Sequence, residues 1–125
     1  MRASVITVLE PVEPGELGFC QAHEHLCIEA GYIAELNPAL LIDEPSSTAV
    51  DLEIYRIAGG RALVDAQPPG CGHNARVMAE LSRKTEIHVI ASTEFHLMRF
   101  YPREHWIHEK TVSELTALFC GELPK

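Results

Sequence analysis

The chain has 125 residues, of which 46% are hydrophobic, and its 18 acidic and 10 basic side chains give a net charge of −8. This length favours one hydrophobic core over two domains. Because no cluster of Lys or Arg stands out, the composition argues against nucleic acid or an anionic membrane surface as a partner. The apolar run at residues 5–9 is too short for an export signal or a membrane span, so we expect a cytoplasmic protein.

The first predicted strand covers residues 19–28 and contains His23, Glu24 and His25. Side chains alternate between the two faces of a strand, so the two imidazoles share one face and Glu24 points to the other. Imidazole nitrogen is a good ligand for zinc and similar ions, which need three or four ligands. The two histidines therefore form half of a candidate metal site.

The chain has four cysteines, Cys20, Cys27, Cys71 and Cys120, and none belongs to a CxxC pair. We expect free thiols, most of them buried. A rival interpretation joins Cys20, His23, His25 and Cys27 in one compact structural zinc site. Structural sites usually combine two separated ligand pairs, however, and strand alternation places Cys20 on the face opposite the histidines. We therefore favour the histidine pair alone.

A helix is predicted to begin at Thr48, after a loop that contains several Gly and Pro residues. The spacing from Thr48 to Asp51 is that of a capping box, and Gly59-Gly60 is typical of a helix that ends in a left-handed conformation. The apolar side chains expected to face the core are Val50, Ile54, Ile57 and Ala58.

Strand and helix patterns alternate through the rest of the chain. Residues 61–66 and 87–92 are apolar runs of strand length, and a helix is predicted over residues 74–84. The buried stripe of that helix comprises Val77, Met78 and Leu81. A long loop at 94–108 follows, rich in aromatic residues and histidine.

The last predicted helix opens at Thr111 and ends just before Gly121. Its apolar side chains are Val112, Leu115, Leu118 and Phe119. Alternation of strands and helices implies a parallel sheet with right-handed crossovers, which begins either an open flavodoxin-like sheet or a (β/α)8 barrel. The chain has no GxGxxG after its first strand and no GxxxxGK[ST], which argues against the open nucleotide-binding sheet.

Several short motifs occur in a characteristic order. Glu16-Leu17-Gly18 precedes His23-Glu24-His25-Leu26, and the later motifs are residues 59–65, Leu81-Ser82, residues 89–93 and Tyr101-Pro102. In this order they resemble the opening of phosphotriesterase-family proteins, which are metal-dependent hydrolases of the amidohydrolase superfamily. The similarity covers nearly the whole chain, residues 1–125.

The resemblance implies an α/β fold, the N-terminal part of a (β/α)8 TIM barrel with about three βα units and parallel strands. It also implies one or two divalent metal ions, commonly zinc, and hydrolysis of phosphoester, lactone or related ester bonds by a metal-bound hydroxide. His23 and His25 would be metal ligands from the first strand. The family's other ligands lie on later strands, which would follow Lys125, so we expect no appreciable turnover from this chain alone.

Two further residues are candidates for supporting the metal site or lining a substrate pocket, on the same side of the barrel as the histidines. Asp65 ends the second strand, where it could orient a ligand histidine or cap backbone amides. His96 lies in the loop after the third strand, where it could line a substrate pocket or simply pack within the loop. Three positions depart from the family pattern: His73 replaces a usual Arg, and Glu86 and Glu94 replace usual glycines.

A non-catalytic alternative is also open. The chain could be a remnant that retains part of the barrel and binds only a metal ion or a partner. An incomplete barrel exposes strand edges, which favours a homo-oligomer or other self-association. In the catalytic interpretation the partner is a small-molecule ester or lactone substrate.

Overall fold

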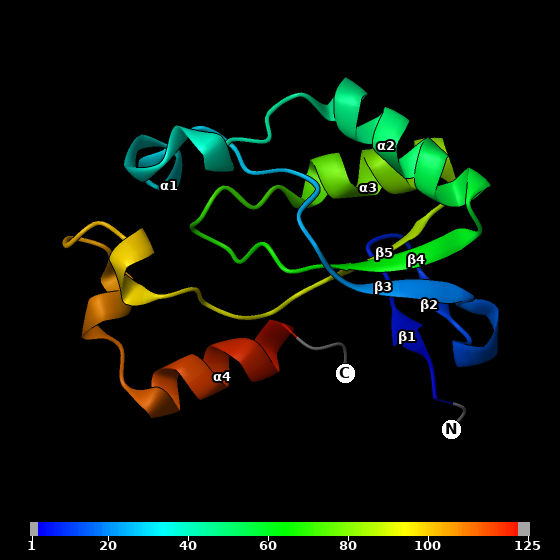
Figure 1. Cartoon of the computed structure of the whole chain (residues 1–125). Helices are drawn as coiled ribbons and strands as arrows, with labels where there is room; N and C mark the ends of the chain where they lie inside the picture. The colour runs from blue at the N-terminus through cyan, green and yellow to red at the C-terminus, as the bar shows by residue number, and fades with distance from the viewer. Residues whose placement is uncertain (1–2, 123–125) are drawn as a thin grey trace.

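Three parallel strands in the order β3-β4-β5 form the central sheet of the molecule (Figure 1). The computed structural model describes residues 3–122. The strands are β3 (Phe19–Glu24), β4 (Gly60–Asp65) and β5 (His88–Ala91). Helix α2 (Pro45–Ile57) connects β3 to β4, and α3 (Ala75–Thr85) connects β4 to β5. The predicted order of parallel βα units is confirmed.

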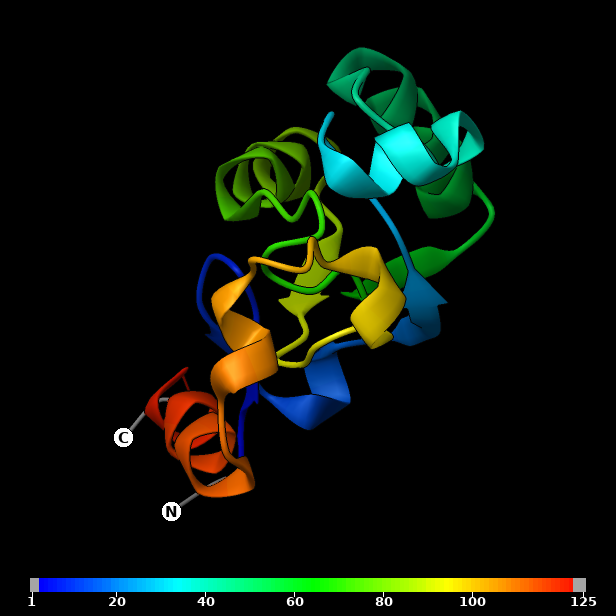
Figure 2. The ribbon, with the colours of Figure 1, turned by 90° about the vertical axis from the view of Figure 1, so that its left-hand side faces the viewer.

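Three long helices lie around the sheet. Helices α2 and α3 lie together over one face of the strands, and α4 (Val112–Glu122) lies on the other side of the sheet from α2 in Figure 1. Turned by 90°, the structure shows α2, α3 and α4 following one another around the strands (Figure 2). Among residues 3–122, no helix is long and apolar enough to cross a bilayer.

An antiparallel hairpin that was not predicted precedes the sheet. It pairs β1 (Val5–Ile6) with β2 (Pro11–Val12). Between these strands, the backbone N–H of Val8 donates to the carbonyl oxygen of Val89 in β5, at 2.8 Å. The hairpin thereby satisfies one acceptor on the free edge of β5, an edge that would otherwise be open to pairing with another chain.

The remaining elements are short. They are helix α1 (Tyr32–Leu36) and the 3-10 turns Pro14–Glu16, Pro38–Leu40, Met98–Phe100 and Trp106–Glu109.

The pairing of β3 with β4 shifts register twice, between Phe19 and Cys20 and between Gln21 and Glu24. Gln21 pairs with Leu63 and Glu24 with Asp65, so three steps along β3 match two steps along β4. Such a bulge changes which side chains share a face. Gln21 and Glu24 both line a cleft under α2, although an unbroken strand would place them on opposite faces.

Tyr55 of α2 fixes the backbone at this irregularity. Its hydroxyl accepts a hydrogen bond from the backbone N–H of Gln21 at 3.1 Å and lies 2.8 Å from the carbonyl oxygen of Ala62, to which it donates. The Tyr55 ring lies directly over Gly60, where a Cβ would come within 2.3 Å of a ring carbon. Only glycine fits at that point of β4.

Two apolar clusters stabilise these elements. The larger lies between the sheet and the helices and comprises Leu26, Ala49, Leu52, Leu63, Met78, Leu81, Ile87 and Val89. The smaller lies under the loop that follows β5 and comprises Ile28, Ile33, Cys71, Tyr101 and Ile107.

The predicted buried face of α2 is wrong. Val50 and Ile54 are each 60% exposed and Ile57 is 75% exposed. The helix begins at Pro45, so the predicted start with a capping box at Thr48 and Asp51 is also wrong. Thr48 lies on the buried face, where its hydroxyl donates to the Leu26 carbonyl at 3.2 Å. Thr48 and Tyr55, which form hydrogen bonds with backbone carbonyls, share the inner face with the buried Ala49 and Leu52. A count of apolar residues could not identify it.

Helix α4 also differs from its prediction. The predicted start is confirmed, and it forms a capping box that was not predicted: the Thr111 backbone N–H donates to the Glu114 carboxylate at 2.9 Å and the Glu114 N–H donates to the Thr111 hydroxyl at 3.3 Å. The helix continues through Gly121 to Glu122, however, and none of its described residues is fully buried. Val112 is 82% exposed.

Candidate functional site

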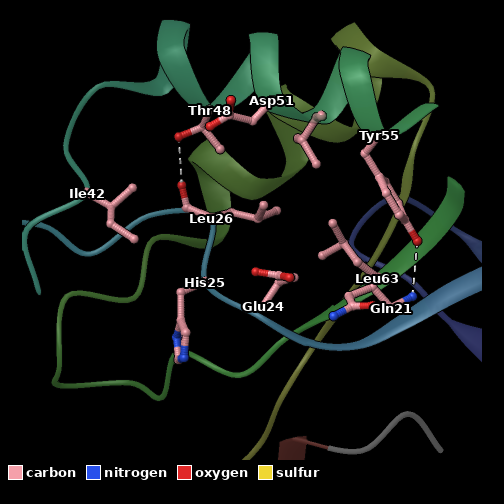
Figure 3. A pocket seen from close by; sticks show the side chains of 10 residues that line it. Gln21, Glu24, His25, Leu26, Ile42, Thr48, Asp51, Tyr55 and Leu63 are labelled. Carbon is pink, nitrogen blue, oxygen red and sulfur yellow. Dashed lines mark hydrogen bonds between the residues drawn. The ribbon is translucent and has the colours of Figure 1, made fainter. Parts of the chain in front are cut away.

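The carboxyl end of β3 brings the two histidines together. The Nε2 atoms of His23 and His25 are 3.2 Å apart, and their ring centroids are separated by 5.1 Å. Figure 3 shows the His25 ring on the side of β3 that faces away from α2. The prediction that the two imidazoles share one face is confirmed.

The separation of these nitrogens fits a shared metal ion. Two nitrogen ligands of one tetrahedral zinc ion, each about 2.0–2.1 Å from the metal, are about 3.3 Å apart. The His23–His25 distance of 3.2 Å is close to that value. Within residues 3–122, however, no group of three or more His, Cys, Asp or Glu side chains is placed to hold a metal ion. The described part of the chain therefore offers two adjacent ligands.

Gln67 contacts the histidine pair, and the sequence did not suggest it. Its Oε1 lies 2.9 Å from Nδ1 of His25, and its Nε2 donates to the Cys71 carbonyl oxygen. Gln67 is only 2% exposed. The available signal was its position two residues after Asp65, since the carboxyl ends of neighbouring parallel strands lie side by side at one edge of the sheet.

Asp65 caps backbone amides and is not hydrogen-bonded to a histidine. Its Oδ2 accepts from the Leu26 N–H at 2.8 Å and its Oδ1 from the Gln67 N–H at 2.9 Å. The side chain is 1% exposed. Of the two roles considered for Asp65, the structure supports backbone capping. The carboxylate joins the end of β3 to the end of β4 beside the histidine pair.

His96 forms its contacts within its own loop. Its Nδ1 accepts from the Leu97 N–H at 2.8 Å, and its ring lies 4.4 Å from that of Phe100, centroid to centroid. Its backbone N–H donates to the hydroxyl of the buried Tyr101 at 3.0 Å. The structure therefore unites His23, His25 and the Asp65 region, while His96 packs locally.

The compact Cys–His zinc site is not formed. Cys27 is buried, and burial raises the pKa of its thiol, with the carboxylates of Glu29 and Asp65 acting in the same direction. Because the described residues contain no group of three or more His, Cys, Asp or Glu side chains that could hold a metal ion, the rival site of Cys20, His23, His25 and Cys27 is wrong. All four cysteines are free, as predicted.

A cleft of about 610 Å³ lies beneath α2, along β3 and the residues that follow it (Figure 3). Its walls include Leu26, Leu52 and Leu63, and the carboxylates of Glu24 and Asp51 lie along it. His25 also lines this cleft, next to Glu24 and Leu26, so the cleft borders the candidate metal site.

The three departures from the family pattern have different structural consequences. Glu86 ends α3 with φ of 57° and ψ of 30°, a left-handed conformation that suits glycine. Among the described non-glycine residues only Glu86 has a positive φ, so Glu94 does not adopt the left-handed conformation that glycine would favour. His73 lies with its Nδ1 2.7 Å from the carbonyl oxygen of Gln67 and thereby helps to hold the loop after β4.

Known proteins are similar to this chain over nearly its whole length. Residues 3–125 match the sequence model of the phosphotriesterase family. An N-acetyltaurine hydrolase from Danio rerio is 26% identical over 98% of this chain and 43% of its own length. A phospho-furanose lactonase from Mycoplasmopsis agalactiae is 25% identical over 95% of this chain and 35% of its own length.

A solved structure shares the fold. An amidohydrolase from Mycoplasma synoviae superposes with a TM-score of 0.89 at 22% identity, over 99% of this chain and 36% of that one. The predicted architecture, an N-terminal part of a TIM barrel with parallel strands, is confirmed. The chain spans well under half the length of the proteins that it matches here.

Proposed function

The chain belongs to the phosphotriesterase family, and on that premise we propose that it carries the first two metal ligands of a metal-dependent hydrolase of the phosphotriesterase and lactonase type. His23 and His25 are those ligands. The observation that carries the proposal is the 3.2 Å separation of their Nε2 atoms, which matches two positions on one tetrahedral ion.

The metal that we propose is zinc. When bound, such an ion would acidify a water molecule for attack and polarise the oxygen on which negative charge develops. The chain's own residues would hold the ion and orient its ligands. His23 and His25 present Nε2 atoms, Gln67 contacts the other nitrogen of His25, and Asp65 fixes the backbone beside both.

The proposed substrates are small molecules with a phosphoester, lactone or related ester bond. The phospho-furanose lactonase among the relatives supports a lactone. N-acetyltaurine hydrolases recur among the relatives, and this observation favours an N-acyl amide as a second candidate. In both cases water attacks a carbonyl carbon.

We also propose that this chain alone has no appreciable turnover. Two imidazoles hold zinc loosely, and an ion without further protein ligands does not orient its water for attack. The non-catalytic alternative, a remnant that binds only metal or a partner, gives the same result in that assay. The catalytic proposal and the non-catalytic alternative can therefore be distinguished only by a test that supplies the remaining part of a barrel.

Such a test joins this chain to the remaining part of the Mycoplasmopsis agalactiae lactonase that it matches over 35% of its length. Substrates are an aryl phosphotriester, a lactone, an aryl ester and N-acetyltaurine, each with added zinc or manganese. We expect hydrolysis by the chimera and none by the chain alone. Turnover that persists after His23→Ala and His25→Ala would contradict the assigned ligands. A folded chimera that hydrolyses none of these substrates would favour the non-catalytic alternative.

Self-association is part of the proposal. Strand β3 pairs with β4 only, so its other edge is open in the described structure, and Phe19 on this strand is 65% exposed. We propose that the chain forms homo-oligomers through such exposed surface. Light scattering after size exclusion tests this, and a monomer at high concentration would contradict it.

A further inference from the structure

All four polar groups of Gln67 are hydrogen-bonded. Its backbone N–H donates to Asp65 Oδ1 at 2.9 Å, and its carbonyl oxygen lies 2.7 Å from Nδ1 of His73. Its side-chain Nε2 donates to the carbonyl oxygen of Cys71, and its Oε1 contacts His25. A buried amide that uses every polar group is held in one orientation.

This network determines which end of the amide faces His25. The Cys71 carbonyl can only accept, so the NH2 group of Gln67 must point toward it. The Oε1 atom then faces Nδ1 of His25 at 2.9 Å. Because Oε1 also can only accept, Nδ1 of His25 must carry the proton.

From this geometry we propose that Gln67 is a positioning residue that selects the metal-binding tautomer of His25. A neutral imidazole has one protonated nitrogen, and only the tautomer with its proton on Nδ1 leaves the Nε2 lone pair free for a metal ion. The inference rests on the proposed function, since it assigns His25 Nε2 as a metal ligand. It adds that His25 is in the binding tautomer before any ion arrives.

The two histidines are then unequal. With its proton on Nδ1, neutral His25 offers a lone pair at Nε2, and the Nε2 of His23 lies 3.2 Å away, within hydrogen-bonding distance. Nε2 of His23 must therefore be the donor in the metal-free pair. Metal binding requires a change of tautomer at exposed His23 and none at half-buried His25.

The first measurement is the tautomer itself. Nitrogen–proton correlation spectra of the metal-free chain at about pH 8, where imidazole is neutral, distinguish a proton on Nδ1 from one on Nε2. We expect His25 to carry its proton on Nδ1 and His23 on Nε2. A His25 proton on Nε2 in the unaltered chain would overturn the inference without any metal in the sample.

The second measurement compares three variants. Gln67→Met removes both side-chain hydrogen bonds at similar volume, and Gln67→Glu keeps an acceptor for His25. Gln21→Met is a matched control at an exposed glutamine of β3. We expect Gln67→Met to lose the single tautomer and to bind Zn²⁺ about 10–100-fold more weakly. Gln67→Glu should retain the tautomer, and Gln21→Met should match the unaltered chain in both measurements.

The outcomes distinguish a failure of the positioning role of Gln67 from a failure of the proposed function. If Gln67→Met keeps the His25 tautomer and the Zn²⁺ affinity, the positioning role is wrong. If the unaltered chain shows the expected tautomer but binds no Zn²⁺, the positioning contact stands and the proposed function fails. If Gln67→Met does not fold, as circular dichroism would show, the tautomers of the unaltered chain and of Gln67→Glu decide the matter.

Discussion

The carboxylate of Asp65 accepts a hydrogen bond from the backbone N–H of Leu26, 2.8 Å away, and thereby joins the ends of two neighbouring strands. Leu26 directly follows His25. The second oxygen of Asp65 accepts from the N–H of Gln67 at 2.9 Å. One buried carboxylate thus holds the backbone on both sides of the contact between His25 and Gln67.

Asp65→Asn should destabilise the fold. An amide has one accepting atom, so one of the two backbone N–H groups would lose its partner in a site that is 1% exposed. An unsatisfied buried donor costs about 1–3 kcal/mol. Urea denaturation measures the loss, and Asp51→Asn at an exposed position of α2 is the control. Equal stability of the two variants would show that the bonds to Leu26 and Gln67 contribute nothing.

Glu86→Gly should stabilise the protein. Glu86 has φ of 57° at the end of α3, a conformation that costs a residue with a Cβ about 1–2 kcal/mol and glycine almost nothing. After allowance for the flexibility of glycine in the unfolded chain, we expect a gain of about 0.5–1 kcal/mol. The same change at Glu80, inside α3, should lower stability. Thermal denaturation in which both variants lose stability would contradict the left-handed geometry.

Tyr55→Phe should weaken the junction of β3 and β4. The change removes the hydroxyl that bonds Gln21 N–H and the Ala62 carbonyl while keeping the ring that covers Gly60. We expect a loss of about 0.5–1.5 kcal/mol. Tyr32→Phe, at a side chain that is 38% exposed, is the matched control, and its free energy of unfolding should equal that of the unaltered chain. A neutral Tyr55→Phe variant would argue against the hydrogen bonds at the bulge.

Acid should loosen the start of α4. Hydrogen bonds from the backbone and hydroxyl of Thr111, with help from Lys110, lower the pKa of Glu114 from 4.5 to about 2. A carboxylate with a depressed folded pKa stabilises the fold above its unfolded pKa, and this contribution is lost as the pH falls from about 4.5 to about 2. The Thr111 amide resonance should follow that titration.

Glu114→Gln should abolish this response of the Thr111 amide to pH, because the amide side chain does not titrate. Glu104→Gln, at an exposed position of the preceding loop, should leave it unchanged. A Thr111 amide that responds only near pH 4.5 in the unaltered chain would show that the contacts to Glu114 are not formed in solution.

The order of strands and helices was readable from the sequence because periodicity reports which residues face a core. The start of α4 at Thr111 was equally readable, since it depends on local spacing, whereas the same kind of spacing at Thr48 and Asp51 does not begin α2, which starts at Pro45. The inner face of α2 was not readable, because Thr48 and Tyr55 are polar residues whose burial depends on acceptors in distant strands. Apolar Val50, Ile54 and Ile57 instead lie exposed on the far side of the helix.

In the candidate site, too, the features set by local spacing were predictable and those set by distant contacts were not. The spacing of His23 and His25 correctly predicted that the two rings lie together, although β3 ends at Glu24 and is irregular after Gln21. The contact of Gln67 with His25 joins residues 42 positions apart, and it requires the relative register of β3 and β4. The bulge between Gln21 and Glu24 sets that register, and periodicity does not reveal a bulge.

The central claim is that His23 and His25 together bind one divalent metal ion. Isothermal titration of the chain with Zn²⁺ tests it most directly, with His23→Ala, His25→Ala and, as a control at an exposed loop histidine, His96→Ala. We expect one ion per chain, loss of that binding in each of the first two variants, and unchanged binding in the third. Zinc binding that survives the loss of either strand histidine, or that fails only with His96→Ala, would contradict the account.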